Sequence, residues 1–253
     1  MTHREQDPRG GQAGRADPIQ PPSGVPPLPL MELEARILHE GQGLLVVHKP
    51  AGWPTSGRSL GDPDCLQYAL IQRSGQMVWA VHQLDADTSG INVFVLEKAL
   101  VPHWQQRLRS PNGEKTYLAI VDGRATFEQR TVDLPIGPLT EGGWGVSPTG
   151  KHALSHLRVR ARGEDCSLLE VMIETGRTHQ IRIHLAALGH PLIGEDWYGE
   201  PGLRRHHRQA LHAWKLRFAD GEQPAAFDCP LPEDLQRLAD QLGLGQVPNE
   251  FPG

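Results

Sequence analysis

Seven short segments of this chain carry the alternating or continuous apolar pattern of β-strands, and they constrain its fold more than any other feature. Each is rich in β-branched or aromatic residues and is bounded by Gly, Pro or Asp, as expected for strands separated by turns. The predicted strands are Ile37–Leu38, Leu44–Val47, Ile91–Leu96, Lys115–Val121, Ala153–Arg160, Ser167–Glu174 and Leu211–Phe218. Because most follow one another without an intervening helix, we predict an α+β fold with a mixed, largely antiparallel central sheet and flanking helices and loops.

Three other segments have the pattern of α-helices. They are Asp64–Arg73, Ala99–Leu108 and His179–Leu188. Thr178 is the predicted N-cap of the last helix, Gly189 the residue that ends it, and Pro191 follows two places later.

The domain organisation follows from a change of composition near residue 30. Residues 1–30 are rich in Pro, Gly and charge and have no apolar periodicity, so we predict a disordered tail. Residues 31–245 contain neither a linker nor an internal repeat, which predicts one folded domain. Residues 246–253 are expected to form a short C-terminal tail.

Composition indicates a cytoplasmic protein. Hydrophobic residues make up 38% of the chain, the mean hydropathy is −0.43, and no apolar run is long enough to span a bilayer. The first residues have no signal-peptide pattern. Cys65, Cys166 and Cys229 are an odd number without CxxC spacing, which favours free thiols in a reducing compartment over disulfides or a zinc site.

The charge and the histidines exclude some classes of partner. The formal net charge of −5 argues against non-specific coating of nucleic acid, although short basic groups such as residues 204–208 leave room for a local basic groove. His179 and His184 do not have the spacing of a helical zinc pair, and His206 and His207 are expected on a loop surface. We therefore expect no metal.

A polar loop before the strand Ile91–Leu96 is the first candidate for chemistry. Asp85 lies there, just before Thr88, Ser89 and Gly90, and loops held by a rigid sheet carry many functional side chains. Asp87 is more simply read as a turn residue that caps Thr88 or Ser89.

Two further residues have settings that suit a ligand. Arg182 projects near the positively polarised N-terminus of a predicted helix otherwise rich in core residues, and it calls for an anion. A phosphate or the Asp85 carboxylate would serve, and a solvated surface position is the alternative. An adjacent guanidinium would keep Asp85 ionised and oriented. Tyr117 offers a flat ring to a planar group, or is a core residue with a satisfied hydroxyl.

These segments together resemble the RluA family of RNA pseudouridine synthases. Residues 82–90 read His-Gln-Leu-Asp-Ala-Asp-Thr-Ser-Gly and resemble the family's His-Arg-Leu-Asp-x-x-Thr-Ser-Gly signature. Similar matches occur, in the family's order, at 49–52 (Lys-Pro-Ala-Gly), 115–119 (Lys-Thr-Tyr-Leu-Ala), 176–185 (Gly-Arg-Thr-His-Gln-Ile-Arg-Ile-His-Leu), 189–194, 198–199 and 211–213. One such motif is a weak signal, whereas several in register are specific.

The resemblance implies an isomerase that converts uridine to pseudouridine in structured rRNA or tRNA without a cofactor. It implies that Asp85 is the catalytic carboxylate, that Tyr117 packs against the target base and that Arg182 pairs with Asp85. It also marks substrate-binding candidates, namely His82, Gln83, Thr88, Ser89, Lys49 and Ile183. For Lys49, a structural role in the turn before Pro50 remains an alternative to a phosphate contact.

One position departs from the family pattern. Gln83 replaces an arginine that the family links to filling the gap left by the flipped base, and glutamine has no charge and stacks less well. A catalytically weak or inactive RNA-binding relative is therefore the alternative reading. A hydrolase of nucleosides or glycosides is a third hypothesis, but it needs a second placed carboxylate, which the spacing of Asp85 and Asp87 does not establish.

The expected partner is RNA alone. We expect no membrane association and no obligate protein partner, which describes a monomer. Residues 1–30 are too few and too rich in proline for the S4-type RNA-binding module of the family, so target recognition is expected to come from the catalytic domain.

Overall fold

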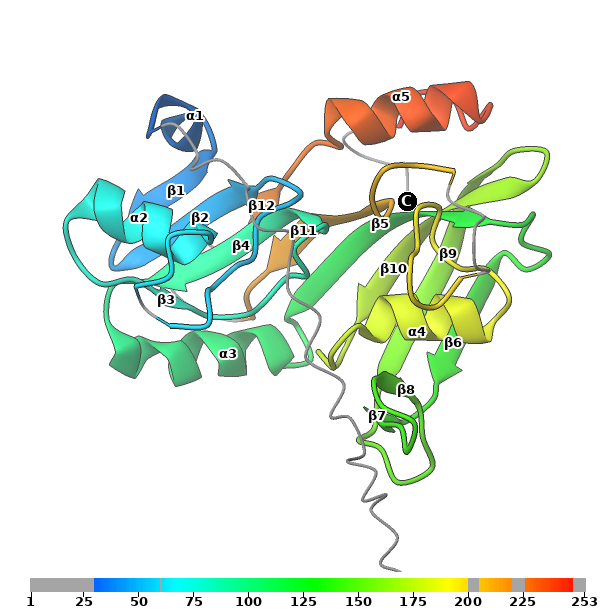
Figure 1. Cartoon of the computed structure of the whole chain (residues 1–253), viewed down its shortest axis with the longest axis horizontal. Helices are drawn as coiled ribbons and strands as arrows, with labels where there is room; N and C mark the ends of the chain where they lie inside the picture. The colour runs from blue at the N-terminus through cyan, green and yellow to red at the C-terminus, as the bar shows by residue number, and fades with distance from the viewer. Residues whose placement is uncertain (1–29, 60, 200–204, 220–225, 248–253) are drawn as a thin grey trace, which may run out of the picture.

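One large sheet runs through the protein. The computed structural model describes residues 30–59, 61–199, 205–219 and 226–247 (Figure 1). Within these ranges the strands lie in the order β1-β2-β4-β11-β5-β10-β9-β6, with β3 beside β4 and β12 beside β11, and β7 and β8 form a separate pair. Every described pairing is antiparallel except that of β4 with β11.

The strands are β1 (Ile37–Gly41), β2 (Leu44–Lys49), β3 (Trp79–Ala80), β4 (Ser89–Val95), β5 (Glu114–Asp122), β6 (Gln129–Asp133), β7 (Ile136–Pro138), β8 (Trp144–Val146), β9 (Leu154–Arg162), β10 (Cys166–Ile173), β11 (Leu211–Arg217) and β12 (Ala226–Asp228). The helices are α1 (Leu30–Glu34), α2 (Leu66–Ser74), the 3₁₀ turn η1 (Lys98–Leu100), α3 (Val101–Arg109), α4 (Gln180–Ala187) and α5 (Glu233–Gln241).

This architecture confirms the predicted α+β class with a mixed, largely antiparallel sheet. All seven predicted strands and all three predicted helices are present, with shifted ends. Most of the elements that the sequence patterns missed are short, such as β3 and β12, or exposed, such as β6. Helix α5 did carry a signal, because Leu235, Leu238 and Ala239 have helical spacing after Pro232.

Helices cover both faces of the central part of the sheet, because alternate residues of a strand point to opposite sides. One set of β5 side chains packs with α4, and the other packs with α5 on the opposite face (Figure 1). The first set is Tyr117, Ala119 and Val121, and the second is Leu118 and Ile120. Tyr117 therefore lies on the face that α4 covers.

The N-terminal part of the sheet is built on the same principle. Leu44 and Val46 of β2 belong to a core cluster with Trp104 and Leu108 of α3. The intervening side chains Leu45 and Val47 pack on the other face, with residues of α1 and α2. Helices α3 and α4 consequently lie on the same side of the sheet (Figure 1).

The start of α4 differs from the prediction. Thr178 is not its N-cap; His179 occupies that position in the left-handed conformation, with φ of 53°. The side chain of Gln180 fixes this entry, because its Oε1 accepts from the backbone N–H of Arg177 (3.1 Å) and its Nε2 donates to Leu154 O (2.9 Å). Gly189, with φ of 77°, follows the helix as predicted.

The predicted tails fall largely outside the described residues. Of residues 1–30 only Leu30, the first residue of α1, is described, and residues 248–253 are likewise outside. Val247 is buried in the cluster under α5. The packed domain therefore extends beyond the predicted boundary at residue 245, to at least Val247.

Candidate active site

The loop that carries Asp85 is fixed by bonds to its backbone. Thr55 Oγ1 accepts from Leu84 N–H (3.0 Å) and donates to Leu84 O (3.2 Å). Lys49 Nζ donates to Ala86 O (2.7 Å), and Thr88 N–H donates to Asp85 O (3.1 Å), which closes the turn. Asp85 is thus held on a rigid turn at the start of β4, which suits a residue that must keep one orientation.

Asp85 meets Arg182 as the resemblance implied. Arg182 Nη1 donates to Asp85 Oδ2 at 3.1 Å. The guanidinium also forms a bidentate pair of hydrogen bonds with Glu195: Nε donates to Oε2 (2.9 Å) and Nη2 donates to Oε1 (2.7 Å). With its amide oxygen turned toward the guanidinium, Gln209 also accepts from Arg182, at 3.2 and 2.9 Å. Three side chains, Asp85, Glu195 and Gln209, therefore bind this one guanidinium and fix its position.

Burial separates the two carboxylates that share Arg182. The side chains of Arg182 and Glu195 are 3% and 1% exposed, whereas Asp85 is 29% exposed. Burial raises the pKa of Glu195, but the bonds and charge of Arg182 outweigh it and leave that pKa lowered. Glu195 is thus a buried anion that fixes Arg182, and Asp85 is the partner that faces the solvent.

Asp85 lies in the wall of a cavity of about 700 Å³. Tyr117 from β5 and Ile181 and Leu211 supply apolar surface to the same cavity. Tyr117 is buried, and its burial together with the charge of Asp85 raises the pKa of its hydroxyl above the usual range. The ring therefore stays neutral beside the carboxylate, so that the cavity combines a fixed negative charge with a flat apolar surface.

Basic side chains line another part of this cavity. Arg109 at the end of α3, Lys115 at the start of β5 and Arg177 before α4 come together there. Burial, reinforced by the charges of Arg109 and Arg177, lowers the pKa of Lys115 to about 8. Such clustering of cations is an environment that favours an anionic ligand.

The structure separates the other predicted site residues into two groups. His82, Gln83 and Thr88 line the cavity with Asp85. Burial lowers the pKa of His82 to about 4, so its imidazole is neutral, and within the described residues neither His82 Nε2 nor Thr88 Oγ1 has a hydrogen-bond partner. Gln83 is exposed, and its Oε1 accepts from Ser56 Oγ (3.1 Å).

Lys49, Ser89 and Ile183 do not line the cavity. Lys49 is fully buried, and its Nζ donates to the carbonyls of Pro50, Trp53 and Ala86. This arrangement corresponds to the structural alternative for Lys49. Ile183 packs in a small apolar cluster with Ile136 and Ala153.

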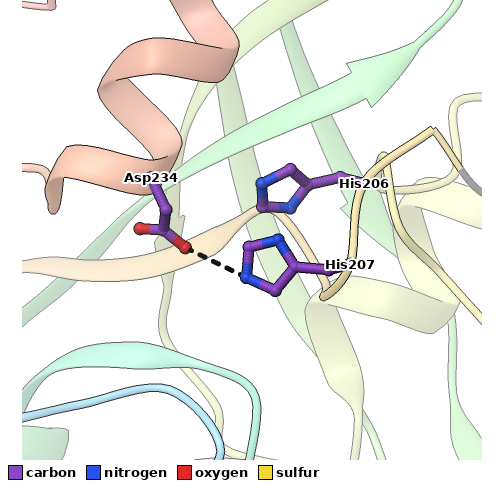
Figure 2. A group of neighbouring side chains, drawn as sticks. All are labelled: His206, His207 and Asp234. Atoms are coloured by element: carbon purple, nitrogen blue, oxygen red, sulfur yellow. Dashed lines mark ion pairs between the residues drawn. The ribbon is translucent and has the colours of Figure 1, made fainter.

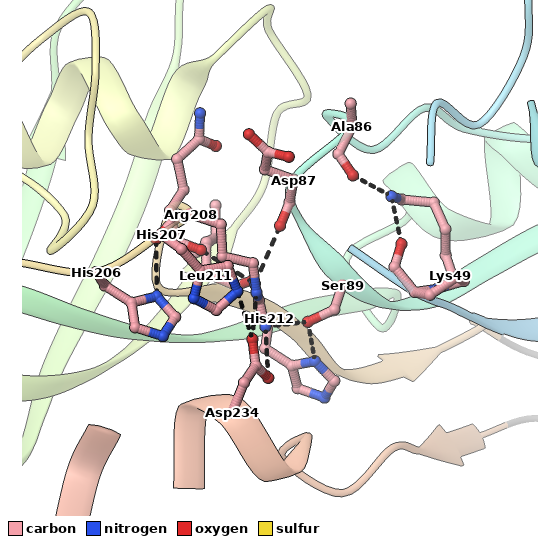
Figure 3. A network of polar contacts seen from close by, with 12 residues as sticks. Lys49, Ala86, Asp87, Ser89, His206, His207, Arg208, Leu211, His212 and Asp234 are labelled. Atoms are coloured by element: carbon pink, nitrogen blue, oxygen red, sulfur yellow. Dashed lines mark hydrogen bonds and ion pairs between the residues drawn. The ribbon is translucent and has the colours of Figure 1, made fainter. Parts of the chain in front are cut away.

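Arg208 is a residue that the sequence reasoning did not single out, and it binds the loop that carries Asp85 (Figure 3). Its Nη1 donates to Asp87 O (3.0 Å), and its Nη2 donates to Ser89 Oγ (3.4 Å). Its Nε donates to Asp234 Oδ2 (2.6 Å), and Nη2 also donates to Asp234 Oδ1 (3.1 Å). Ser89 also bonds His212 Nδ1 (2.9 Å). The only sign of this role in the sequence was the basic group at residues 204–208.

His206, His207 and Asp234 form a surface group whose donor atoms lie within 4.8 Å of one another (Figure 2). Such a set has the chemistry of a metal site. The Asp234 carboxylate, however, already accepts from Arg208 through both oxygens, and the positive guanidinium would repel a cation. We assign this group to the ion-pair network of Arg208.

No helix within the described ranges has the length and apolarity needed to cross a membrane. Cys65, Cys166 and Cys229 are all buried free thiols. The site therefore combines the oriented carboxylate of Asp85, the ring of Tyr117 and a basic wall in one cavity.

Comparisons with known proteins identify the family of the chain. Residues 43–187 match the family model described as RNA pseudouridylate synthase. The uncharacterized RNA pseudouridine synthase YhcT of Bacillus subtilis (strain 168) is 37% identical over 219 residues, covering 81% of this chain and 71% of the relative. Ribosomal large subunit pseudouridine synthase D of Xanthomonas campestris is 35% identical over 235 residues, covering 83% and 70%.

A solved structure shows the same likeness. Human RNA pseudouridylate synthase domain containing 1 aligns with a TM-score of 0.68 and 28% identity, over 88% of this chain and 100% of that chain. The chain belongs to the RNA pseudouridylate synthase family, and is an isomerase that acts on RNA. This confirms the resemblance seen in the motifs.

Proposed function

We propose that this protein isomerises uridine in RNA to pseudouridine with Asp85 as its catalytic carboxylate. The observation that carries the proposal is the fixed carboxylate itself: Arg182 holds Asp85 at 3.1 Å in a cavity that Tyr117 also lines. The second oxygen, Oδ1, lies 3.8 Å from His179 Nε2. Burial lowers the pKa of His179, so a neutral imidazole adjoins the carboxylate.

The reaction needs no co-substrate, because every bond that breaks or forms lies within one uridine, apart from the exchange of protons. The N1–C1′ bond breaks, the uracil turns, C5 bonds to C1′, and the proton on C5 is lost while N1 gains one. A carboxylate beside C1′ stabilises or attacks the electron-poor sugar carbon, or it removes a sugar proton. In this proposal the ribose enters the cavity between Asp85 and Tyr117, which both line it.

The cavity wall supplies groups for the base and the backbone. Tyr117 offers its ring to the uracil. His82 and Thr88 line the same cavity, and their buried atoms Nε2 and Oγ1 have no hydrogen-bond partner within the described ranges. Arg109, Lys115 and Arg177 would neutralise phosphates of the flanking nucleotides. Gln83 lacks the charge of an arginine, so we infer that the target uridine lies in an RNA segment that is already unstacked.

We propose large-subunit rRNA as the substrate. The relative from Xanthomonas campestris, and that from Vibrio vulnificus at 33% identity, are named ribosomal large subunit pseudouridine synthase D. We further propose that the chain works as a cytoplasmic monomer without an obligate protein partner.

The first experiment determines which uridine is modified and whether its conversion to pseudouridine requires Asp85. Pseudouridines are mapped in total RNA from cells with and without the gene, and purified protein is tested on the mapped RNA. Asp85→Asn and Asp85→Ala are expected to lower the rate at least about a thousandfold, which corresponds to about 4 kcal/mol of transition-state stabilisation. RNA binding is expected to persist.

Asp87→Asn is the matched control, because Asp87 lies in the same loop and contributes its backbone oxygen to Arg208. It should stay within tenfold of the unchanged protein. Full activity of Asp85→Asn would refute the assigned role. RNA binding without pseudouridine would favour the inactive relative, and release of free uracil would favour the hydrolase.

A further inference from the structure

Trp197 lies beside the cavity with a ring that the proposed chemistry does not use. Its side chain is 57% exposed, the highest value among the exposed large hydrophobic residues of the described ranges. Trp53, Trp104 and Trp214 are instead buried. Exposing a large indole forgoes the favourable burial of its apolar surface, so a position with this much exposure next to an active site calls for a ligand.

The exposed ring is nevertheless held in place. The backbone N–H of Trp197 donates to Glu195 Oε1 (3.0 Å), the carboxylate that also binds Arg182. Arg182 Cζ lies 5.0 Å from the ring centroid, and the His179 ring lies 5.1 Å away at 63°. These contacts occupy part of the indole and leave the rest to solvent. A contact surface that is already ordered loses less entropy when a ligand binds.

The same contacts fix where Trp197 lies relative to the reaction. Arg182 and His179 both line the cavity, and Arg182 binds Asp85. Trp197 does not itself line the cavity, but its ring contacts Arg182 and His179, which do, so it lies one side chain away from the carboxylate of Asp85. A nucleotide whose base contacts this ring would be a close neighbour of the nucleotide that occupies the cavity.

We propose that Trp197 is a stacking platform for an unpaired base next to the target uridine. This inference rests on the proposed function, because it takes RNA to be the ligand of the cavity. A planar indole can stack on any base, and each base stacked on an aromatic side chain contributes about 1–3 kcal/mol to binding. The cations Arg109, Lys115 and Arg177 in the cavity wall are complementary to the phosphates of the same strand.

The platform gives this chain a contact that does not depend on Gln83. Gln83 and Trp197 come from the loop before β4 and the segment after α4, respectively. Stacking on Trp197 would hold a neighbouring base out of the helix, which favours an unstacked target. Part of the recognition is thus assigned to an aromatic side chain that packs on the cavity residues Arg182 and His179.

The test compares RNA binding and turnover for Trp197→Ala, Trp197→Tyr and Trp144→Ala. Trp144 is a matched control, because it is an exposed tryptophan on β8 (39%), whereas the Trp197 ring contacts the cavity residues Arg182 and His179. Binding is measured first with large-subunit rRNA transcribed in vitro. Trp197→Ala should raise Kd and KM about tenfold, with a much smaller change in kcat. Trp197→Tyr should recover most of the loss, and Trp144→Ala should behave like the unchanged protein.

A second arm uses short synthetic RNAs that lack one base at each position flanking the mapped uridine. At one position the missing base should weaken the unchanged protein about as much as Trp197→Ala does, and combining the two should add no further loss. A Trp197→Ala defect of equal size on every abasic RNA would show a merely structural effect and overturn the inference.

The two proposals fail in different ways. An active enzyme whose RNA affinity is the same in Trp197→Ala refutes the stacking platform alone. A protein that binds RNA through Trp197 but forms no pseudouridine refutes the proposed function alone.

Discussion

Two buried arginines hold the loop of Asp85 from opposite ends, and they do so in different ways. Arg182 binds the side chain of Asp85, while Arg208 binds the backbone oxygen of Asp87 and the hydroxyl of Ser89. Each guanidinium also forms a bidentate ion pair with a carboxylate. The partner of Arg182 is Glu195, and the partner of Arg208 is Asp234.

The difference lies in what each arginine leaves available. The loop acceptor bound by Arg182 is a carboxylate that lines the cavity, and its second oxygen remains for a ligand. The loop acceptors bound by Arg208 are a backbone oxygen and the hydroxyl of a buried serine, and neither is an ionisable group. Arg182 thus orients the side chain of Asp85, whereas Arg208 fixes the backbone of the loop that carries it.

Substitution of Arg182 is expected to have the largest effect and tests whether the two arginines have different roles. Arg182→Met should lower activity at least about a hundredfold, as for loss of a preorganised electrostatic partner, and destabilise the fold by about 3–5 kcal/mol because Glu195 is left buried and unpaired. Activity assays and urea unfolding measure the two effects. Adding Glu195→Gln should restore most of the stability but not the activity. Joint recovery of both would contradict a catalytic use of Arg182.

Removing Arg208 should affect stability more than chemistry. Arg208→Met is expected to cost about 2–3 kcal/mol, less than for Arg182 because Asp234 keeps 32% exposure and stays solvated. Arg208→Lys should not restore the loss, since an ammonium cannot replace the planar fork. The free energy of unfolding and the rate at a temperature where the variant is folded are compared. A rate loss as large as that of Arg182→Met would erase the distinction.

Lowering the pH should reduce the free energy of unfolding through His212, which bonds Ser89 beside Arg208. Its Nδ1 bonds Ser89 and its Nε2 bonds Cys229 O (2.9 Å), and burial lowers its pKa from 6.5 to about 3. The unfolded chain therefore binds more protons below pH 6.5, and stability falls as the pH falls toward 3. Between pH 7 and 5 this histidine should cost about 2 kcal/mol. Urea midpoints of His212→Gln should change less over that interval than those of the unchanged protein.

The smallest expected effect is on RNA affinity, when a cation of the basic cavity wall is removed. Arg109→Gln should weaken RNA binding only a few-fold and lower the slope of log K against log salt by about 1, as for loss of one phosphate contact. Arg237→Gln, on α5 across the sheet, is the control and should leave the slope unchanged. Equal slopes for both variants would show that RNA does not reach Arg109.

The sequence predicted what local patterns encode and missed what distant residues create. Alternation of side chains was enough for β5 and β10, and short motifs were enough to select Asp85 and Arg182. Glu195 and Arg208 were not selected, although Glu195 follows a recognised motif and Arg208 lies in a basic group. Their importance comes from partners 13 to 121 positions away, and pairings over such distances leave no local pattern.

Close backbone contacts were equally hidden. A Cβ on Gly90 would lie 2.2 Å from Ala213 O, and one on Gly194 would lie 1.9 Å from Arg208 O. Both glycines lie in the motifs, but the motifs do not show that Gly90 approaches Ala213 of β11 and that Gly194 approaches Arg208, just before β11. The shift of the α4 cap from Thr178 to His179 has a similar origin, because bonds of Gln180 to β9 decide where the helix begins.

The place of β11 also has a consequence for synthesis of the chain. This strand lies between β4 and β5, yet its residues, Leu211–Arg217, are made almost ninety residues after the last of β5. Until they leave the ribosome, the nascent chain holds two sheet fragments whose inner edges are unpaired and prone to wrong association. The late strand also brings His212 to Ser89, so the loop of Asp85 is completed only when translation has passed this strand.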